Sequence, residues 1–123
     1  MTITFITGAN KGLGYETARR LIDQGHTVIL GARDAERGRN AAAALGARFV
    51  RIDVTDAESV ASAAADVERQ EGVVDVLINN AGIPGPHSAV EELTAEDVQS
   101  VLDVNVLGIV RTTTAFLPLL RRS

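Results

Sequence analysis

Residues 7–14 read Thr7-Gly8-Ala9-Asn10-Lys11-Gly12-Leu13-Gly14, and this stretch decides the fold. It follows an apolar run of strand length. It precedes residues that recur at helical spacing, namely Leu13, Thr17, Ala18, Leu21 and Ile22. Small residues between a strand and a helix leave backbone N–H groups bare at the positive end of the helix, where phosphate groups bind. The stretch therefore predicts a diphosphate site, although its GxxxGxG spacing leaves a plain strand–helix turn as the alternative.

The rest of the chain alternates strand-length apolar runs with helix-length segments. The predicted strands are Thr2 to Thr7, Thr27 to Ala32, Ala47 to Ile52 and Val74 to Ile78. Their Val, Ile and Leu content, with little polar alternation, is typical of strands covered on both faces. The pattern predicts an α/β fold of Rossmann type, with three layers of βαβ units around a parallel sheet.

Capping patterns and apolar spacing predict where the later helices lie. Thr55-Asp56-Ala57-Glu58 has the form of a capping box with Thr55 as the cap, and Thr94-Ala95-Glu96-Asp97 is a weaker version. From Thr94 onward we expect one long helix, which proline kinks or ends near Pro118. Its predicted apolar stripe is Val98, Val101, Leu102, Val106, Ile109, Thr113, Phe116, Leu117 and Leu120. Residues 81–88 are rich in turn formers and predict a loop.

Length and composition bound the remaining possibilities. At 123 residues, the sequence indicates a single domain over residues 1–123. The absence of cysteine excludes disulfides and thiolate metal sites and suits the cytoplasm, where we expect the protein. No residue pattern predicts a metal site. A net charge of −4 with interspersed signs predicts neither a nucleic-acid nor a membrane partner.

The stretch TGANKGLG resembles the TGxxxGxG fingerprint of the short-chain dehydrogenase/reductase family. Its residues at the variable positions resemble those of the carbonyl reductase-like branch. Further matches follow at Asp53-Val54, at Asn79-Asn80-Ala81-Gly82 and at Asn105-Val106-Leu107-Gly108. The resemblance implies an oxidoreductase that acts on a carbonyl or a secondary alcohol. It covers nearly the whole chain, which corresponds to the first half of a typical member. We therefore expect the fold to be truncated after the fourth strand and the long helix.

The end of the second predicted strand indicates which cofactor binds. A site for NAD usually has an acid there, whereas this chain has Leu30-Gly31-Ala32-Arg33. Arg33 can clamp a 2'-phosphate, and in the family a basic residue at the position of Lys11 also accompanies NADP. We expect NADP, with NAD less favoured. The alternatives are an Arg33 paired with Asp34 or Glu36, and a Lys11 that is a free surface charge.

The resemblance also implies the site residues. Those for the dinucleotide are Gly8, Asn10, Lys11, Gly12, Leu13, Gly14, Arg33, Asp53, Val54, Asn80, Ala81 and Gly82. Asn105 falls on the apolar stripe and must have a bonding partner; in the family the matching residue sits at a helix break and holds a proton-relay water. The resemblance also implies that the Asp53 carboxylate and the Val54 backbone meet the adenine. Asp53 is free for this role because Thr55 is expected to cap the next helix, and a local turn bond is its alternative. The alternatives for the other residues are a satisfied core amide for Asn105 and turn chemistry for the pair Asn79-Asn80, with a structural share for Asn79 in tying neighbouring strands together.

The tyrosine and lysine of the family's catalytic YxxxK pair are missing from this sequence. Its one tyrosine, Tyr15, follows its one lysine, Lys11, in the wrong order, and His26, His87 and Ser88 are expected at the surface without a paired base. We expect the chain alone to bind a nucleotide without turnover, and a catalytically inactive binding module or a fragment is the alternative function. We also expect a homo-oligomer through the helix at 94–120, or completion by another chain.

Overall fold

A computed structural model describes residues 1–86 and 89–123. Its sheet has four parallel strands in the order β3-β2-β1-β4. The strands are β1 (Ile3–Ile6), β2 (Thr27–Ala32), β3 (Arg48–Arg51) and β4 (Val76–Ile78). This order confirms the Rossmann-type prediction, with strands one or two residues shorter than expected at some ends.

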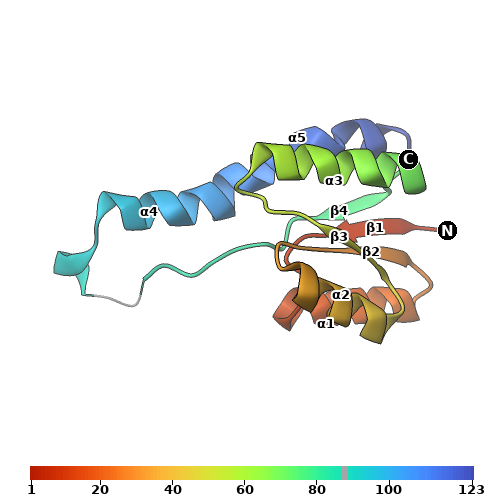
Figure 1. The fold of residues 1–123 in the computed structure, drawn as a ribbon, viewed down its shortest axis with the longest axis horizontal. Coiled ribbons are helices and arrows are strands. Elements are labelled where there is room, and N and C mark those ends of the chain that lie inside the picture. Colours follow the sequence, from red (N-terminus) through yellow and green to blue (C-terminus); the bar gives the residue numbers. More distant parts are fainter. Residues whose placement is uncertain (87–88) are drawn as a thin grey trace.

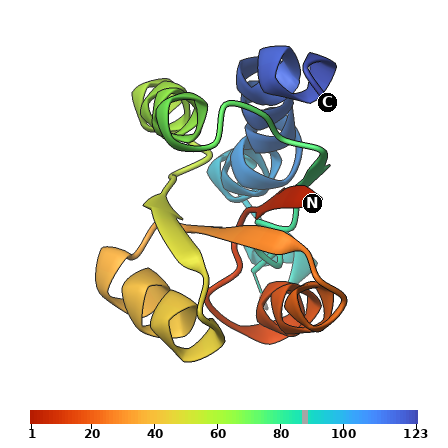
Figure 2. The same cartoon turned by 90° about the vertical axis from the view of Figure 1, so that its right-hand side faces the viewer.

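Helices cover both faces of the sheet, as Figures 1 and 2 show. The helices on one face are α1 (Gly12–Asp23) and α2 (Ala35–Leu45), and those on the other are α3 (Ala57–Gln70) and α5 (Gly108–Arg121). Side chains alternate between the two resulting cores, so that Phe5 packs toward α3 and α5 while Ile6 packs toward α1 and α2. The chain therefore forms three layers.

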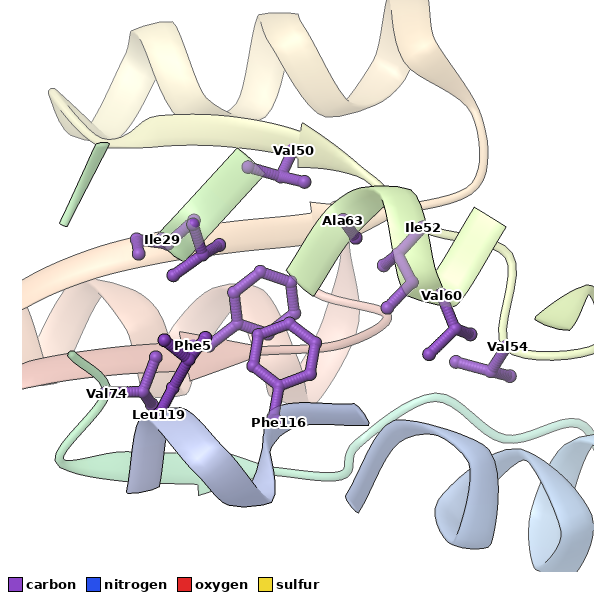
Figure 3. Close-up of a cluster of buried hydrophobic side chains, with 11 residues drawn as sticks. Phe5, Ile29, Val50, Ile52, Val54, Val60, Ala63, Val74, Phe116 and Leu119 are labelled. Atoms are coloured by element: carbon purple, nitrogen blue, oxygen red, sulfur yellow. The ribbon is translucent and has the colours of Figure 1, made fainter. Parts of the chain in front are cut away.

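The larger core is built around two phenylalanines (Figure 3). The rings of Phe5 and Phe116 lie 4.6 Å apart between centroids and are fully buried. Burial of a side chain of this size contributes roughly 1.5–3 kcal/mol. This contact fixes α5 against β1 and so sets where the start of α5 meets the carboxyl edge of the sheet.

The helix starts confirm one predicted cap and correct the other. Thr94 and Asp97 form the predicted capping box of α4 (Ala95–Leu102). At α3, however, the cap is Asp56, whose carboxylate accepts the N–H groups of Glu58 and Ser59. The Thr55 prediction is wrong because the Thr55 hydroxyl donates instead to Asp53.

The predicted long helix forms, but of the predicted apolar stripe only Phe116 is among its buried residues. After the short 3-10 turn η1 (Val90–Glu92), α4 runs through a π-helical turn, η2 (Asp103–Leu107), into α5. The helix continues through Pro118 and ends at Arg121. Its buried residues are Gly108, Thr112, Phe116 and Leu119.

Much of the predicted apolar stripe is exposed instead, including Val98, Leu102, Val106, Ile109 and Leu117. Two causes act together. First, α4 stands out from the three layers (Figure 1), so nothing in the described chain covers it. Second, the π-helical turn adds a residue to the helix and so rotates the later residues by about 100° around the axis.

By length and composition alone, the continuous helix from Ala95 to Arg121 is able to span a membrane. It has 27 residues, a mean hydropathy of 1.2 over its most apolar window, and 17% of that window buried. Its α5 part, however, packs one face on the sheet through Phe116 and Leu119, as the core helices of many globular proteins do. The expectation of no membrane partner stays a prediction.

Candidate functional site

The glycine-rich turn lies where the carboxyl ends of β1 and β4 meet. Gly8 has a φ of 62°, in the left-handed region that favours glycine, and a Cβ there would come within 2.8 Å of the Cα of Ala81. A Cβ at Gly14 would collide with the amide of Asn80. Both glycines therefore let the turn pack directly against the segment that follows β4.

The first turn of α1 differs from those of the other described α-helices that begin from a loop. Its N-cap residue, Lys11, makes no side-chain cap, and the turn has no acidic residue, whereas α2, α3 and α4 have both. The leading N–H groups of a helix lack partners within the helix and carry partial positive charge. The start of α1 can thus receive an anion, as the position of the glycines predicts.

Two side chains join the turn to the end of β4. The buried hydroxyl of Thr7 accepts the N–H groups of Asn80 and Ala81, both at 3.0 Å, and the Asn80 amide donates to the carbonyl of Gly8 at 3.0 Å. Asn79 instead donates to the Thr113 hydroxyl at 3.2 Å. Asn80, rather than Asn79, therefore connects the neighbouring strands, and Thr7 has a role that motif spacing did not assign.

The end of β2 presents Arg33 beside the cleft. Among the described residues, neither Arg33 nor Lys11 belongs to an ion pair. The acid next to Arg33, Asp34, caps α2, and its carboxylate lies 3.8 Å from the guanidinium of Arg37. The alternative of an Arg33 paired with Asp34 or Glu36 is therefore not what the structure shows. The side chain of Arg51 donates to the carbonyl of Arg33 at 3.0 Å and so fixes the backbone of this corner.

The end of β3 places Asp53 at the cleft, but not with a free carboxylate. One carboxylate oxygen of Asp53 accepts the hydroxyl of Thr55 at 2.7 Å and its N–H at 3.0 Å. The hydrogen bond from the Thr55 hydroxyl is the largest cause of a lowered Asp53 pKa, with the charges of Arg51 and Arg33 also contributing. The local turn bond, which was the alternative, is present, and the second oxygen is the one left to meet a ligand.

Asn105 lies in the π-helical turn η2 and has the bonding partner that its position requires. Its amide oxygen accepts the N–H of Ile83 at 2.8 Å, and its amide nitrogen donates to the carbonyl of Ile83 at 2.9 Å. This pairing holds the loop after β4 against the helix. In place of the expected helix break, the structure has a π-helical turn through which the helix continues. The proton-relay role stays a prediction.

These elements enclose a cleft of about 470 Å³ at the carboxyl edge of the sheet. The expected residues that line it are Gly8, Asn10, Lys11, Gly12, Arg33, Asp53, Val54, Asn80, Ala81 and Gly82. Leu13 and Gly14 do not line it; the side chain of Leu13 is 77% exposed, contrary to its place on the predicted apolar face of the first helix. Residues of the lining that the motifs missed are Asp34, Arg37, Ile52, Thr55, Ile83 and Val104.

A shallower hollow of about 440 Å³ adjoins the cleft on the side of α1 and α2. It shares Asn10, Lys11 and Arg37 with the cleft and adds Tyr15, Asn40 and Ala41. Three cations, Lys11, Arg33 and Arg37, thus face one corner of the site. Arg37 was missed because nothing in the sequence separates it from its helix neighbour Arg39, which does not line either hollow.

Comparison with known proteins agrees with this geometry. The family model described as short chain dehydrogenase matches residues 2–123. The chain belongs to the short-chain dehydrogenase family. One relative is the L-fucose dehydrogenase of Oryctolagus cuniculus, which is 36% identical over 122 residues, 98% of this chain and 43% of that protein.

Two solved structures of the family have the same architecture. The 3-ketoacyl-(acyl-carrier-protein) reductase of Brucella melitensis, complexed with NADH, has a TM-score of 0.91 at 29% identity and matches 98% of this chain and 51% of its own. The alcohol dehydrogenase of Thermococcus sibiricus, complexed with 5-hydroxy-NADP, has a TM-score of 0.86 at 37% identity and matches 99% of this chain and 54% of its own. The chain spans about half the length of these short-chain dehydrogenase relatives.

The other candidate residues contribute little to the cleft. His26 lies near the opposite, amino edge of the sheet, where its ring bonds the Thr4 hydroxyl at 3.0 Å. His87 and Ser88 lie outside the described residues. Within residues 1–86 and 89–123, no cluster of histidines and acids is able to hold a metal ion.

Proposed function

We propose that this chain carries the cofactor-binding site of an NADP(H)-dependent oxidoreductase that acts on a carbonyl or a secondary alcohol. The observation that carries the proposal is the cleft itself, in which the uncapped start of α1 faces the ends of β1 and β4. In open parallel sheets, ligands bind at this edge, where the strand connections diverge in direction. The pyrophosphate of the cofactor would lie on the leading N–H groups of α1.

The preference for NADP rests on the three cations at the corner formed by α1, β2 and α2. Arg33 and Lys11 have no ionic partner among the described residues, so they are available to a 2'-phosphate. Asp34 turns its carboxylate to the start of α2, where it accepts the N–H of Arg37 at 2.9 Å. An acid used in this way is less available to the 2'-hydroxyl that distinguishes NAD.

Titration of the chain with NADP(H) and with NAD(H), for wild type and Arg33→Ala, tests this proposal. A charge-assisted hydrogen bond is worth roughly 1.5–3 kcal/mol, so we expect Arg33→Ala to weaken NADPH binding by about ten- to a hundredfold and NADH binding much less. Arg39→Ala removes an exposed cation of α2 that does not line the cleft, and this control should bind both as wild type does. Equal losses for both cofactors in Arg33→Ala would refute the NADP preference.

For the chain of 123 residues, we expect binding without turnover. Its sequence has no tyrosine followed four residues later by lysine, and Asn105 is the one residue that matches the family's catalytic set. Asn105 would act from its place beside Ile83. An assay of NADPH oxidation with a panel of ketones measures this directly, and appreciable turnover by the chain would contradict it.

A further inference from the structure

The helix α5 places one arginine directly behind the wall of the cleft. The guanidinium of Arg111 donates from Nη1 to the carbonyl of Val54 at 3.1 Å and to the carbonyl of Asp103 at 3.2 Å. Its Nη2 donates to a carboxylate oxygen of Asp103 at 2.7 Å. The side chain is 28% exposed, so most of it is shielded from water. One planar group therefore joins the segment after β3 to the beginning of the π-helical turn.

The two segments that Arg111 joins lead to different parts of the cleft wall. Val54 lines the cleft next to Asp53, where we place the adenosine end of the cofactor. Asp103 begins η2, the same turn whose Asn105 holds the N–H and the carbonyl of Ile83, another lining residue. A chain of hydrogen bonds thus runs from Val54 through Arg111 and η2 to the loop after β4.

The start of α5 packs so closely against Val54 at Gly108 that neither segment can shift toward the other. A Cβ at Gly108 would lie 2.8 Å from Cγ2 of Val54 and 3.4 Å from the carbonyl oxygen of Asp103. The start of α5 therefore touches Val54 directly, and Val54 stands at the edge of the core cluster in Figure 3. Val54 is held at its side chain by Gly108 and at its carbonyl by Arg111.

We propose that Arg111 is a positioning residue that sets the separation between the Val54 and Ile83 walls of the cleft. The proposal rests on the proposed function, since it concerns the fit of the same dinucleotide. Arginine suits this role because its rigid fork donates to several acceptors at once, whereas the single ammonium of lysine does not reproduce that geometry. Arg111 itself does not line the cleft, so it acts through Val54 and Asn105.

The test compares Arg111→Met with Arg122→Met in the whole chain. Arg122 follows α5 at its other end and also bonds a carbonyl and an acid, those of Gly72 and Glu68, far from the cleft lining. NADPH affinity is measured by fluorescence titration, and the folded fraction by circular dichroism. We expect Arg111→Met to weaken NADPH binding by about tenfold, which is the loss of roughly one charge-assisted hydrogen bond. Arg122→Met should stay within about twofold of wild type, as expected for a surface ion pair.

A second ligand separates positioning from a general loss of structure. Adenosine 2',5'-bisphosphate contacts only the adenosine end, so in Arg111→Met its affinity should fall less than that of NADPH. Arg111→Lys keeps the charge and should restore only part of the loss. If the Arg111→Met protein is unfolded, Arg111→Lys and Asp103→Asn supply the same comparison.

Three outcomes would overturn the proposal. Wild-type NADPH affinity in a folded Arg111→Met would do so, as would proportional losses for NADPH and the bisphosphate, or equal losses in the Arg111 and Arg122 variants. Absence of dinucleotide binding by the wild-type chain would instead refute the proposed function, before any variant is compared.

Discussion

At the scale of single residues, Asp53 divides its two carboxylate oxygens between local structure and the cleft. Asp53 accepts two hydrogen bonds from Thr55 with one oxygen and keeps the other at the cleft. The sequence predicted a free Asp53 because Thr55 was expected to cap the next helix. Asp56 does so instead, which follows from its carboxylate reaching two N–H groups of α3. The motif predicted that Asp53 lies at the site, and Asp53 does line the cleft. Because Thr55 and Asp56 are both polar and close in sequence, the motif did not decide which of them bonds Asp53 and which caps α3.

The Asp53 carboxyl gives a pH prediction. Its pKa is lowered chiefly by the Thr55 hydroxyl, so its folded-state pKa lies below the ordinary value. The resulting stabilisation is fully present above the ordinary pKa and is lost as the pH falls through the lowered one. We expect Thr55→Val to raise the Asp53 pKa and to cost about 1 kcal/mol at pH 7, a cost that shrinks in acid.

Carbon-13 NMR titration of the Asp53 carboxyl, with urea unfolding at both ends of the pH range, measures this. Thr55→Ser retains the hydroxyl and should keep the wild-type pKa. The interpretation fails if the Asp53 pKa is the same in Thr55→Val and in wild type.

At the scale of elements, periodicity predicted which segments are helices and strands but not every face that packs. Leu13 and the exposed residues of the long helix satisfied helical spacing, yet nothing in the described chain covers them. The π-helical turn at Asp103–Leu107 changes the register of α5. The family resemblance implied an irregular helix at Asn105, but the apolar spacing gave no sign of the extra residue. Arg111 escaped prediction for a related reason, since its acceptors are largely backbone carbonyls that only the folded chain brings together.

The exposed apolar side chains of α4 and η2 support a proposal of self-association. Leu102 is 46% exposed and Val106 is 49% exposed, on a helix that projects beyond the three layers (Figure 1). Patches of this kind commonly mark contact surfaces. We expect the chain to self-associate, with Leu102→Lys or Val106→Lys shifting the equilibrium toward monomer by about tenfold or more, because each would bury a charge.

Sedimentation velocity over a range of concentrations tests this surface. Gln99→Lys, on an exposed polar position of α4, is the matched control and should leave association unchanged. A wild-type chain that stays monomeric at high concentration would contradict the expectation.

At the scale of the whole molecule, the order β3-β2-β1-β4 brings together residues that are far apart in the sequence. Asn80 meets Gly8 across 72 positions, and Arg111 meets Val54 across 57. The motifs predicted that the segments holding Gly8 and Asn80 meet, because the carboxyl ends of parallel strands share one edge, but they gave the tie between strands to Asn79 and not to Asn80. They did not predict the second, which needs the packing of α5 beside α3 on the same face of the sheet.

The central claim is that the leading N–H groups of α1 receive the pyrophosphate of a dinucleotide. A crystal structure of the chain grown with NADP⁺ tests it most directly. We predict the pyrophosphate at the start of α1 beside Gly12, the 2'-phosphate beside Arg33, and the adenine near Val54. A dinucleotide bound elsewhere, with the start of α1 facing only solvent at saturating cofactor, would contradict it.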